Sequence, residues 1–443
     1  TAKESGRTAG ITGGKGKESV MRDLRVLIFS NHCFSRSDSN GRTLGNFFAG
    51  WDTECLAQFS VSGSDPDFSV CRNYFCVSDR EALYAIFGKK CGGRLKSDAE
   101  NDPPAHAAAA GHRRNALTMM LRNGIWNLGA WKSCGFSEWV RDFSPQVVLL
   151  QTGDCAFMMR LARKTAAECH VPLLIYNSED YYFKKHDYFR GRFLSHWVYP
   201  IFAHQMRREF CKTQNVATHT IYNGKALQSA YRAVFSGESS VLYTSTALTP
   251  FPPRKSGGTF VVSYLGNLGV GRHLVLAEIA AVLQELSPAC FLDVYGNPPD
   301  ETVRDILQNT PGIRYHGSVP YAEVVRIMER SDLLVHAENF SDYYRKDLRF
   351  AFSTKIADCL AVGRCFLLYA PEDMASYRYL RENALAYTAS TPEELRETLH
   401  LLLTDEGARS AYLSRALAAA KENHNLEKNR LAVKTMIRAA VEK

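Results

Sequence analysis

Three charged residues stand near predicted strand ends between residues 331 and 370. Glu338 follows a short apolar segment, whereas Lys355 and Asp358 lie on a predicted helix of residues 355–361 that stops before a second apolar segment. Carboxylates accept hydrogen bonds from sugar hydroxyls, and a lysine together with the backbone amides of a helix start binds phosphate. These residue types at this spacing therefore predict a site for a phosphorylated sugar, such as a nucleotide sugar.

Glycine-rich loops follow several predicted strands in the same half of the chain. Residues 266–272 (GNLGVGR) lie between a strand and a helix, so their backbone can approach a pyrophosphate and Arg272 can pair with it. Their spacing differs from the dinucleotide fingerprint G-x-G-x-x-G, and a plain turn would explain the same letters. The other candidate donor-binding residues of this half are Gly266, Asn267, Gly296, Gly317, Val319, Ser353 and Thr354.

Two series of alternating strands and helices would position these loops. In the first half, strands are predicted at 25–30, 56–61, 73–77, 146–151 and 172–177. In the second half, six strands are predicted at 259–266, 291–296, 313–317, 332–337, 365–369 and 384–388. Such alternation is typical of parallel sheets covered by helices, which bind ligands at the carboxyl ends of their strands. The predicted fold class is α/β, with two Rossmann-like doubly wound parallel-sheet domains facing a cleft.

Composition shifts mark the predicted domain boundaries. The Gly, Lys and Ser-rich start is interpreted as an expression remnant, and a Pro-rich stretch as an interdomain linker. Residues 92–114, rich in Gly, Pro, Ala and charge, are predicted to be a flexible loop. The predicted units are 1–20 (remnant), 21–244 (first domain, for the acceptor), 245–258 (linker), 259–422 (second domain, for the nucleotide sugar) and 423–443 (a helix packing back on the first domain).

The loops of the second half, taken together, resemble the carboxyl-terminal domain of glycosyltransferase family 4, the retaining sugar transferases of the GT-B fold. Asp358 stands five positions before Gly363, where that family places the second Glu of its last motif. The family's first Glu would fall at Phe350, so Glu338, followed by about a dozen extra residues, is the candidate for its role. The resemblance implies that Asp358 binds the ribose hydroxyls and that Glu338 binds the transferred sugar.

The resemblance also implies how the donor diphosphate is held. The family's G-R-L arrangement reads Gly266-Asn267-Leu268 here, and Arg272 stands where the family has Lys. Phosphate pairing is therefore expected from Arg272 and Lys355, and Ser353 and Thr354 are expected to cap the helix that presents its amides to the phosphates. In the first domain, Asn40 and Gly41 resemble the family's small glycine turn, which contacts the donor phosphate.

The reacting centre is expected at the carboxyl ends of two first-domain strands. Family members commonly keep a His after the strand that corresponds to residues 146–151, and this chain has Asp154 nearby instead. Asp154 is the candidate catalytic carboxylate, Glu179 and Asp180 are its rivals, and Asp180 and Tyr181 are also candidates for acceptor binding. The resemblance implies departure and attack on the same face of the sugar, with the leaving phosphate itself helping to take the proton.

An aromatic and basic stretch of residues 181–210 has two interpretations. Rings interleaved with Lys and Arg could hold a lipid-linked diphosphate acceptor or contact an anionic bilayer. A buried helix with a solvated basic face would explain the same letters. Both interpretations stay open at the level of sequence.

Composition restricts the remaining choices. The net charge of +8 suits an anionic ligand, whereas no Lys/Arg run suggests nucleic acid. The twelve cysteines contain no C-x-x-C pair and predict reduced, buried thiols in a cytoplasmic protein. No apolar stretch is long enough to cross a bilayer, so any membrane contact would be peripheral. No metal and no cofactor are expected, because Arg272 and Lys355 can offset the charge of a diphosphate.

Three functions are compatible with these patterns. The first is a retaining glycosyltransferase that moves a sugar from a UDP- or GDP-type donor to a carbohydrate or lipid-linked acceptor in polysaccharide or glycoconjugate biosynthesis. The second is a non-catalytic protein of the same fold that binds a nucleotide sugar or glycan. The third is a dinucleotide-dependent oxidoreductase, which neither half favours because the fingerprint turn and its partner acid are missing.

Overall fold

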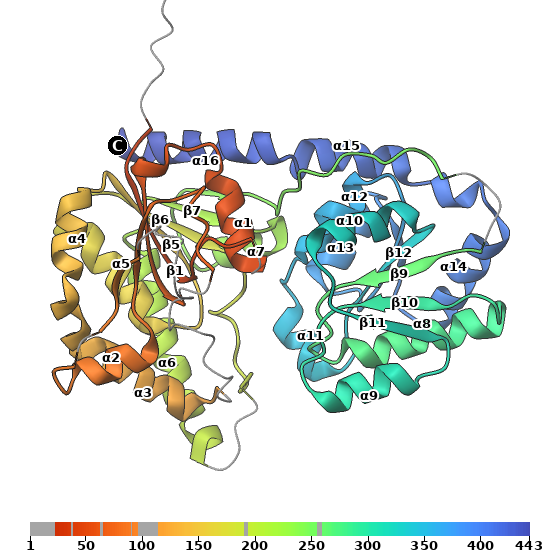
Figure 1. Cartoon of the computed structure of the whole chain (residues 1–443), viewed down its shortest axis with the longest axis horizontal. Coiled ribbons are helices and arrows are strands. Elements are labelled where there is room, and N and C mark those ends of the chain that lie inside the picture. Colours follow the sequence, from red (N-terminus) through yellow and green to blue (C-terminus); the bar gives the residue numbers. More distant parts are fainter. Residues whose placement is uncertain are drawn as a thin grey trace, which may run out of the picture.

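The computed structural model describes residues 23–36, 39–62, 65–89, 91–95, 114–189, 194–254 and 259–443. The segment interpreted as a remnant, and most of the loop predicted at 92–114, lie outside these residues. Two α/β domains stand side by side, each with a central sheet flanked by helices (Figure 1).

The first domain contains an eight-stranded sheet with the order β4-β3-β2-β1-β5-β6-β7-β8. All neighbouring strands are parallel except β3 and β4, which pair antiparallel. The central strands are buried on both faces, as their continuous Val, Leu and Ile runs predict. The strands are β1 (Val26–His32), β2 (Leu56–Ser62), β3 (Asn73–Cys76), β4 (Gly93–Leu95), β5 (Val147–Gln151), β6 (Leu173–Asn177), β7 (His219–Tyr222) and β8 (Ser239–Val241).

Helices cover both faces of this sheet. Side chains of α3 to α6 form one core with it, and Phe47 of α1 helps to form the core on the other face. The helices are α1 (Ser39–Phe48), α2 (Asp79–Ala85), α3 (Ala116–Leu128), α4 (Phe136–Phe143), α5 (Ala156–Glu168), α6 (Leu194–Gln214) and α7 (Lys225–Arg232).

The second domain contains a six-stranded, fully parallel sheet with the order β11-β10-β9-β12-β13-β14. The strands are β9 (Val262–Leu265), β10 (Leu292–Tyr295), β11 (Ile313–Gly317), β12 (Leu333–Ala337), β13 (Cys365–Tyr369) and β14 (Tyr387–Ala389). Its helices are α8 (Arg272–Leu286), α9 (Glu301–Asn309), α10 (Tyr321–Arg330), α11 (Asp342–Leu348), α12 (Thr354–Ala361), α13 (Ala375–Glu382), α14 (Pro392–Thr404) and α15 (Leu413–Asn423). The predicted fold class, two parallel-sheet domains with flanking helices, is confirmed.

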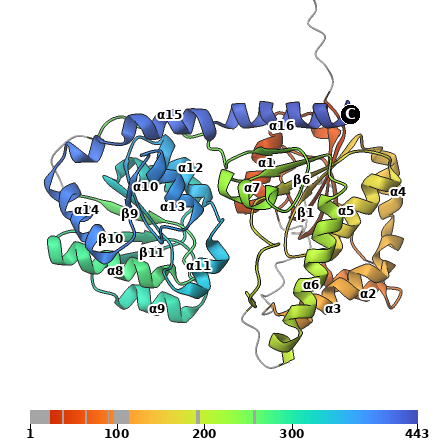
Figure 2. The same cartoon turned by 180° about the vertical axis from the view of Figure 1, so that it is seen from behind.

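The last helix, α16 (Leu426–Val441), joins the end of the chain to the first domain (Figures 1 and 2). Helix α15 contributes Ala416 and Ala420 to a core of the second domain, whereas α16 contributes Val433 and Ile437 to the core beneath α1. The two domains are therefore connected twice, by the linker after β8 and by the junction between α15 and α16.

His424 lies buried where these two connections meet. Its Nδ1 donates to the Thr244 carbonyl at 2.8 Å, so its Nε2 accepts from the Tyr379 hydroxyl at 3.0 Å. The ring is fully buried beside Tyr243 and Phe352. Burial lowers the pKa of His424 to about 4, although the bond to the carbonyl opposes this shift.

Because His424 is buried in its neutral form, we expect the free energy of unfolding to fall in mild acid. The unfolded chain takes up a proton near pH 6.5 and the folded His424 only near pH 4, so stability falls as the pH drops between these values. Between pH 7 and pH 5 we expect His424→Gln to lose about 2 kcal/mol less free energy of unfolding than wild type. Urea unfolding at both pH values measures this, with the exposed His400→Gln as control; equal losses in wild type and His424→Gln would refute the assignment.

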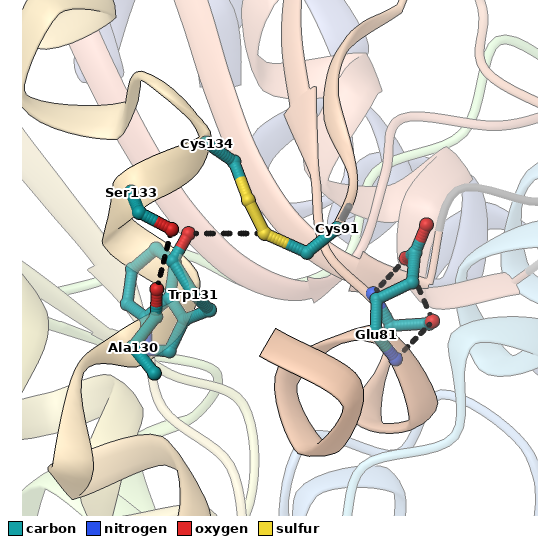
Figure 3. The surroundings of a disulfide bond; sticks show 7 residues. Glu81, Cys91, Ala130, Trp131, Ser133 and Cys134 are labelled. Atoms are coloured by element: carbon teal, nitrogen blue, oxygen red, sulfur yellow. Dashed lines mark hydrogen bonds between the residues drawn. A yellow bond between two sulfur atoms is a disulfide. The ribbon is translucent and has the colours of Figure 1, made fainter. Parts of the chain in front are cut away.

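The prediction that all cysteines are reduced is wrong for one pair. Cys91 and Cys134 form a disulfide, with Cα atoms 6.1 Å apart (Figure 3). The pair joins the segment before β4 to a 3-10 helix of residues Ala130–Cys134, next to the carbonyl of Trp131. Sequence could not indicate this pair because the two cysteines are 43 positions apart and meet only through the folding of the first domain.

None of the helices in the described ranges is both long enough and apolar enough to span a lipid bilayer.

Candidate functional site

The carboxyl ends of both sheets border a large cavity between the two domains, which we call cavity 1. It has a volume of about 580 Å³ and an open mouth. The first domain contributes Arg36 and Arg42, and the second contributes loops after β9, β10 and β11 together with α10 and α12. Candidate residues that line it are Gly266, Asn267, Gly296, Val319, Lys355 and Asp358.

Lys355 and Asp358 lie on one face of α12, one turn apart, as their spacing predicts. Burial lowers the pKa of Lys355, and the charge of Arg272 adds to this effect. Burial raises the pKa of Asp358, while hydrogen bonding with Thr246 and the charges of Arg42 and Lys355 oppose it. The pair therefore places a cation and an acceptor at the floor of an interdomain cavity.

The expected cap of α12 is only partly present. Ser353 is the N-cap residue and Thr354 begins the helix, but the Ser353 side chain makes no capping hydrogen bond. The helix start therefore keeps amide groups that an anion could accept from. Because the helix begins beside Lys355, these amides lie on the same side of the site as the lysine.

Close packing at the mouth of cavity 1 requires glycine. A side chain at Gly296 would place its Cβ 1.9 Å from the carbonyl oxygen of Gly266, and at Gly266 it would lie 3.0 Å from the Lys355 side chain. Gly317 has φ +78°, the left-handed conformation that glycine adopts without strain. Gly266 and Gly296 therefore let the loops after β9 and β10 pack closely against each other, and Gly266 also lets Lys355 approach.

Arg272 and Glu338 are bound to each other and do not line cavity 1. The guanidinium donates to both carboxylate oxygens at 2.8 Å, and His336 donates to Glu338 Oε1 at 3.1 Å. Burial alone would raise the pKa of Glu338, but the charges and hydrogen bonds of Arg272 and His336 lower it to about 2. Of the three side chains, His336 lines cavity 1. In this structure Glu338 occupies the Arg272 guanidinium, so the pairing of Arg272 with a diphosphate stays a prediction.

The extra residues after Glu338 form α11, which contacts the first domain. Asp347 pairs with His186 at 2.9 Å, and the Tyr343 hydroxyl donates to the Asp187 carbonyl at 3.0 Å. Helix α11 therefore connects the second domain to the first across the cleft.

The first-domain wall contains a small cavity, cavity 2, of about 110 Å³. It is lined by the ends of β1 and β5 and the segment after β6, together with Arg114. The candidates Asn40, Asp154, Glu179 and Tyr181 line it together. Asp154 accepts from Arg114 at 3.3 Å, and Glu179 accepts from the Tyr181 hydroxyl at 2.9 Å.

A smaller space of about 70 Å³, cavity 3, lies between the domains and shares Asn40 and Glu179 with cavity 2. The second domain contributes Phe352 and Thr354 to it. Cavity 3 therefore connects the surroundings of Glu179 with the start of α12.

Asp180 stabilises the turn after β6, a role that the sequence did not indicate. Its Oδ1 accepts from the Tyr231 hydroxyl at 2.7 Å and from the amides of Tyr182 and Phe183 at 3.0 Å. The carboxylate is buried and holds the turn after β6, so its contacts belong to that turn rather than to cavity 2.

The loop assignment of Asn40 and Gly41 is wrong, because α1 begins at Ser39 and both residues lie in its first turn. A Cβ at Gly41 would lie 2.3 Å from the Cys33 carbonyl oxygen, so glycine lets the helix start against the end of β1. Asn40 reaches cavities 2 and 3 from this helix.

The site residues predicted from sequence did not include the first-domain arginines of cavity 1, Arg36 and Arg42. Arg42 lies over the ring of Tyr321 at 4.6 Å from its centroid, across the cleft, and Arg36 pairs with Asp67 at 2.8 Å. Arg36 lies in the loop after β1 and Arg42 in the first turn of α1, at the edge where such sheets bind ligands, and this place could have revealed them.

Helix α6 buries some aromatic side chains of this stretch and exposes other apolar ones. Tyr199, Phe202 and others of its side chains pack in the first-domain core. Leu194, Trp197 and Ile201 are exposed by 62%, 80% and 53%.

Comparison with known proteins supports the same architecture. Residues 272–434 match the family described as glycosyl transferase-like. HepE of Anabaena, solved with UDP and glucose, superimposes with a TM-score of 0.61 at 11% identity, covering 94% of this chain and 100% of that chain. The chain has the GT-B fold of glycosyltransferases.

Two further structures are similar over most of their length. Sucrose-phosphate synthase of Thermosynechococcus elongatus has a TM-score of 0.61 at 10% identity, covering 94% of this chain and 98% of that chain. WaaG, a glycosyltransferase involved in lipopolysaccharide biosynthesis, has a TM-score of 0.51 at 10% identity, covering 93% and 99%. A search of curated proteins found no significant match.

Proposed function

We propose that this GT-B protein is a glycosyltransferase that uses a nucleoside-diphosphate sugar and retains the anomeric configuration. The observation that carries the proposal is cavity 1, which Lys355, Arg42 and Asp358 line together, with Lys355 in the first turn of α12. Cations and helix amides suit a diphosphate, and a carboxylate suits ribose hydroxyls. The match of residues 272–434 to a glycosyl transferase-like family supports the same activity.

The donor would lie across cavity 1 with its diphosphate at Lys355 and its ribose at Asp358. Arg42 would approach the phosphates from the first domain, so that binding draws the two domains together. HepE has been solved with UDP and with UDP-glucose, which supports a UDP-sugar, with a GDP-sugar as the other candidate. We propose no metal cofactor, because these cations and the α12 amides can offset the diphosphate charge.

The transferred sugar would then face cavity 2 and cavity 3. The bond between the anomeric carbon and the diphosphate oxygen breaks, its electron pair leaves with the nucleoside diphosphate, and an acceptor hydroxyl attacks the same face. The acceptor proton passes to a leaving phosphate oxygen, with Asp154 or Glu179 orienting the acceptor. Tyr181 would contact the acceptor beside Glu179. Glu338 and Arg272 would act as positioning residues that hold His336 at the cavity wall.

The acceptor is proposed to be a carbohydrate or a lipid-linked glycan in polysaccharide or glycoconjugate biosynthesis. The exposed Leu194, Trp197 and Ile201 lie at spacings that share one face of α6. Such a face, with Arg208 exposed on the same helix, suits peripheral contact with an anionic membrane at the cytoplasmic side. WaaG, whose name places it in lipopolysaccharide biosynthesis, supports this class of acceptor.

A nucleotide panel tests the donor class. We expect UDP or GDP to raise the melting temperature, whereas NAD leaves it unchanged, because cavity 1 offers a diphosphate site without a dinucleotide fingerprint. ADP serves as the purine control for base selection. Stabilisation by NAD alone would contradict the proposal and favour an oxidoreductase.

Turnover distinguishes an enzyme from a binding protein. A nucleotide sugar that stabilises wild type should be consumed with a suitable glycan acceptor, and NMR of the product should show the donor's anomeric configuration. Binding of the nucleotide without turnover over a broad acceptor panel would instead favour a non-catalytic sugar-nucleotide-binding protein.

A further inference from the structure

A second large space between the domains, cavity 4, has a volume of about 570 Å³ and shares no residue with cavity 1. Lys225 lines it from the start of α7, whereas Arg349 and Arg378 line it from the second domain. Phe352 lines both cavity 4 and cavity 3, so this ring separates cavity 4 from the proposed reacting centre.

The charges of cavity 4 favour an anion. Lys225, Arg349 and Arg378 face a single carboxylate, Glu382, among the lining residues. In the part of the chain that the structure describes, none of these three cations forms an ion pair, whereas many other surface arginines do. Their charges are therefore available to a ligand, and two of them, Lys225 and Arg349, are exposed to solvent.

Helix α7 adds to this positive potential. Its N-cap residue is Gly224, which has no side chain that could accept from the first-turn amides. Gly224 and Lys225 both line cavity 4. The Lys225 amide donates to the Tyr243 hydroxyl at 3.4 Å, and the following amides of the helix start, together with the Lys225 side chain, add positive potential on the α7 side of the cavity.

Aromatic side chains complete the cavity. Tyr243, Phe350, Phe352 and Tyr379 line it. Tyr243 and Tyr379 pack against each other with ring centroids 5.0 Å apart, next to the buried His424. Tyr243 and Phe352 are buried, so the half-buried Phe350 and Tyr379 offer the ring surface on which a sugar can pack, and the volume lies within the usual range for a small-molecule site.

We propose that cavity 4 binds a phosphorylated, monosaccharide-sized ligand, with its phosphate between Lys225 and Arg378 and its ring near Tyr379. The ligand would contact both domains beside the two chain connections, so its binding would stabilise their closed arrangement. This site is separate from the proposed donor site and does not depend on transferase activity.

Calorimetric titration with glucose 6-phosphate tests the site, carried out in the presence of saturating UDP so that cavity 1 is occupied. Glucose and inorganic phosphate are the partial probes. We expect wild type to bind glucose 6-phosphate more tightly than either, and Lys225→Gln and Arg378→Gln each to weaken it at least about tenfold. Arg381→Gln is the matched control, because Arg381 is also on α13 but bonds to Tyr377 and Thr388 outside the cavity.

Two controls keep the result decisive. Unchanged UDP affinity in Lys225→Gln and Arg378→Gln shows that both variants are folded, whereas Lys355→Ala should bind UDP about 10- to 100-fold more weakly and keep glucose 6-phosphate binding. The proposal is overturned if wild type binds neither glucose 6-phosphate nor phosphate. It is also overturned if binding survives both cavity substitutions, or if it is lost with Lys355→Ala and therefore belongs to cavity 1.

Discussion

Replacing Lys355 by alanine is expected to weaken binding of the nucleoside diphosphate about 10- to 100-fold. A hydrogen bond to a charged group contributes about 1.5–3 kcal/mol, and Lys355 lies in cavity 1 beside the uncapped start of α12. Because Lys355 is half-buried in the cleft, water only partly replaces its ammonium in the variant. The dissociation constant of UDP or GDP, measured by calorimetry, gives the effect directly.

The control for this variant is Lys421→Ala. Lys421 is exposed near the end of α15, a helix that packs against α12, so the substitution removes the same side chain from a neighbouring element without touching cavity 1. It should leave nucleotide affinity within about twofold of wild type. Asp358→Asn should also weaken the nucleoside diphosphate while leaving pyrophosphate affinity nearly unchanged, because its carboxylate is assigned to the ribose. If Lys355→Ala and wild type bind the nucleoside diphosphate with equal affinity, the diphosphate does not bind at this part of the cleft.

Replacing Arg272 by methionine is expected to lower the free energy of unfolding by about 3–5 kcal/mol. The substitution leaves the Glu338 carboxylate buried without its principal cation, and such uncompensated charges cost this much. The pKa of Glu338, about 2 in the folded protein, should rise in the variant. Because a lowered carboxylate pKa stabilises above the unfolded value, the wild-type contribution is present above about pH 4.5 and fades as the pH falls toward 2.

A double variant separates the ion pair from simple loss of packing. Arg272→Met with Glu338→Leu removes both charges, so it should be more stable than Arg272→Met alone. The exposed pair of Arg304 and Glu301 on α9 provides the reference, and Arg304→Met should cost less than about 1 kcal/mol. If Arg272→Met costs no more than Arg304→Met in urea unfolding, the pair does not stabilise the site as described.

Local patterns predicted most of the second domain and the donor wall of the cleft. The strand and helix alternation predicted six strands, and the described sheet has six, although β14 spans Tyr387–Ala389 instead of 384–388. Lys355 and Asp358 share a helix face because three-residue spacing brings side chains together wherever a helix forms. The glycines at strand ends likewise mark places where loops crowd, since close approach excludes a side chain.

Local patterns did not predict which distant residues contact each other. Arg272 and Glu338 were each assigned to a ligand, yet they bind each other across 66 positions. Asp180 was assigned to an acceptor, yet Tyr231 holds it 51 positions away. A carboxylate looks the same in sequence whether its partner is a sugar or an arginine, because the partner is chosen by packing.

The sequence alone predicted the parallel-sheet domains and the residue types on them that can bind a phosphorylated sugar. Periodicity and glycine placement depend on residues a few positions apart, so both can be recognised in short segments of the sequence. The meeting of Arg42 with Lys355 in one cavity, the disulfide of Cys91 with Cys134, and the contact of α11 with the first domain were decided only in the folded protein. Each of these depends on how two distant elements pack, and packing geometry leaves no short-range pattern in the order of residues.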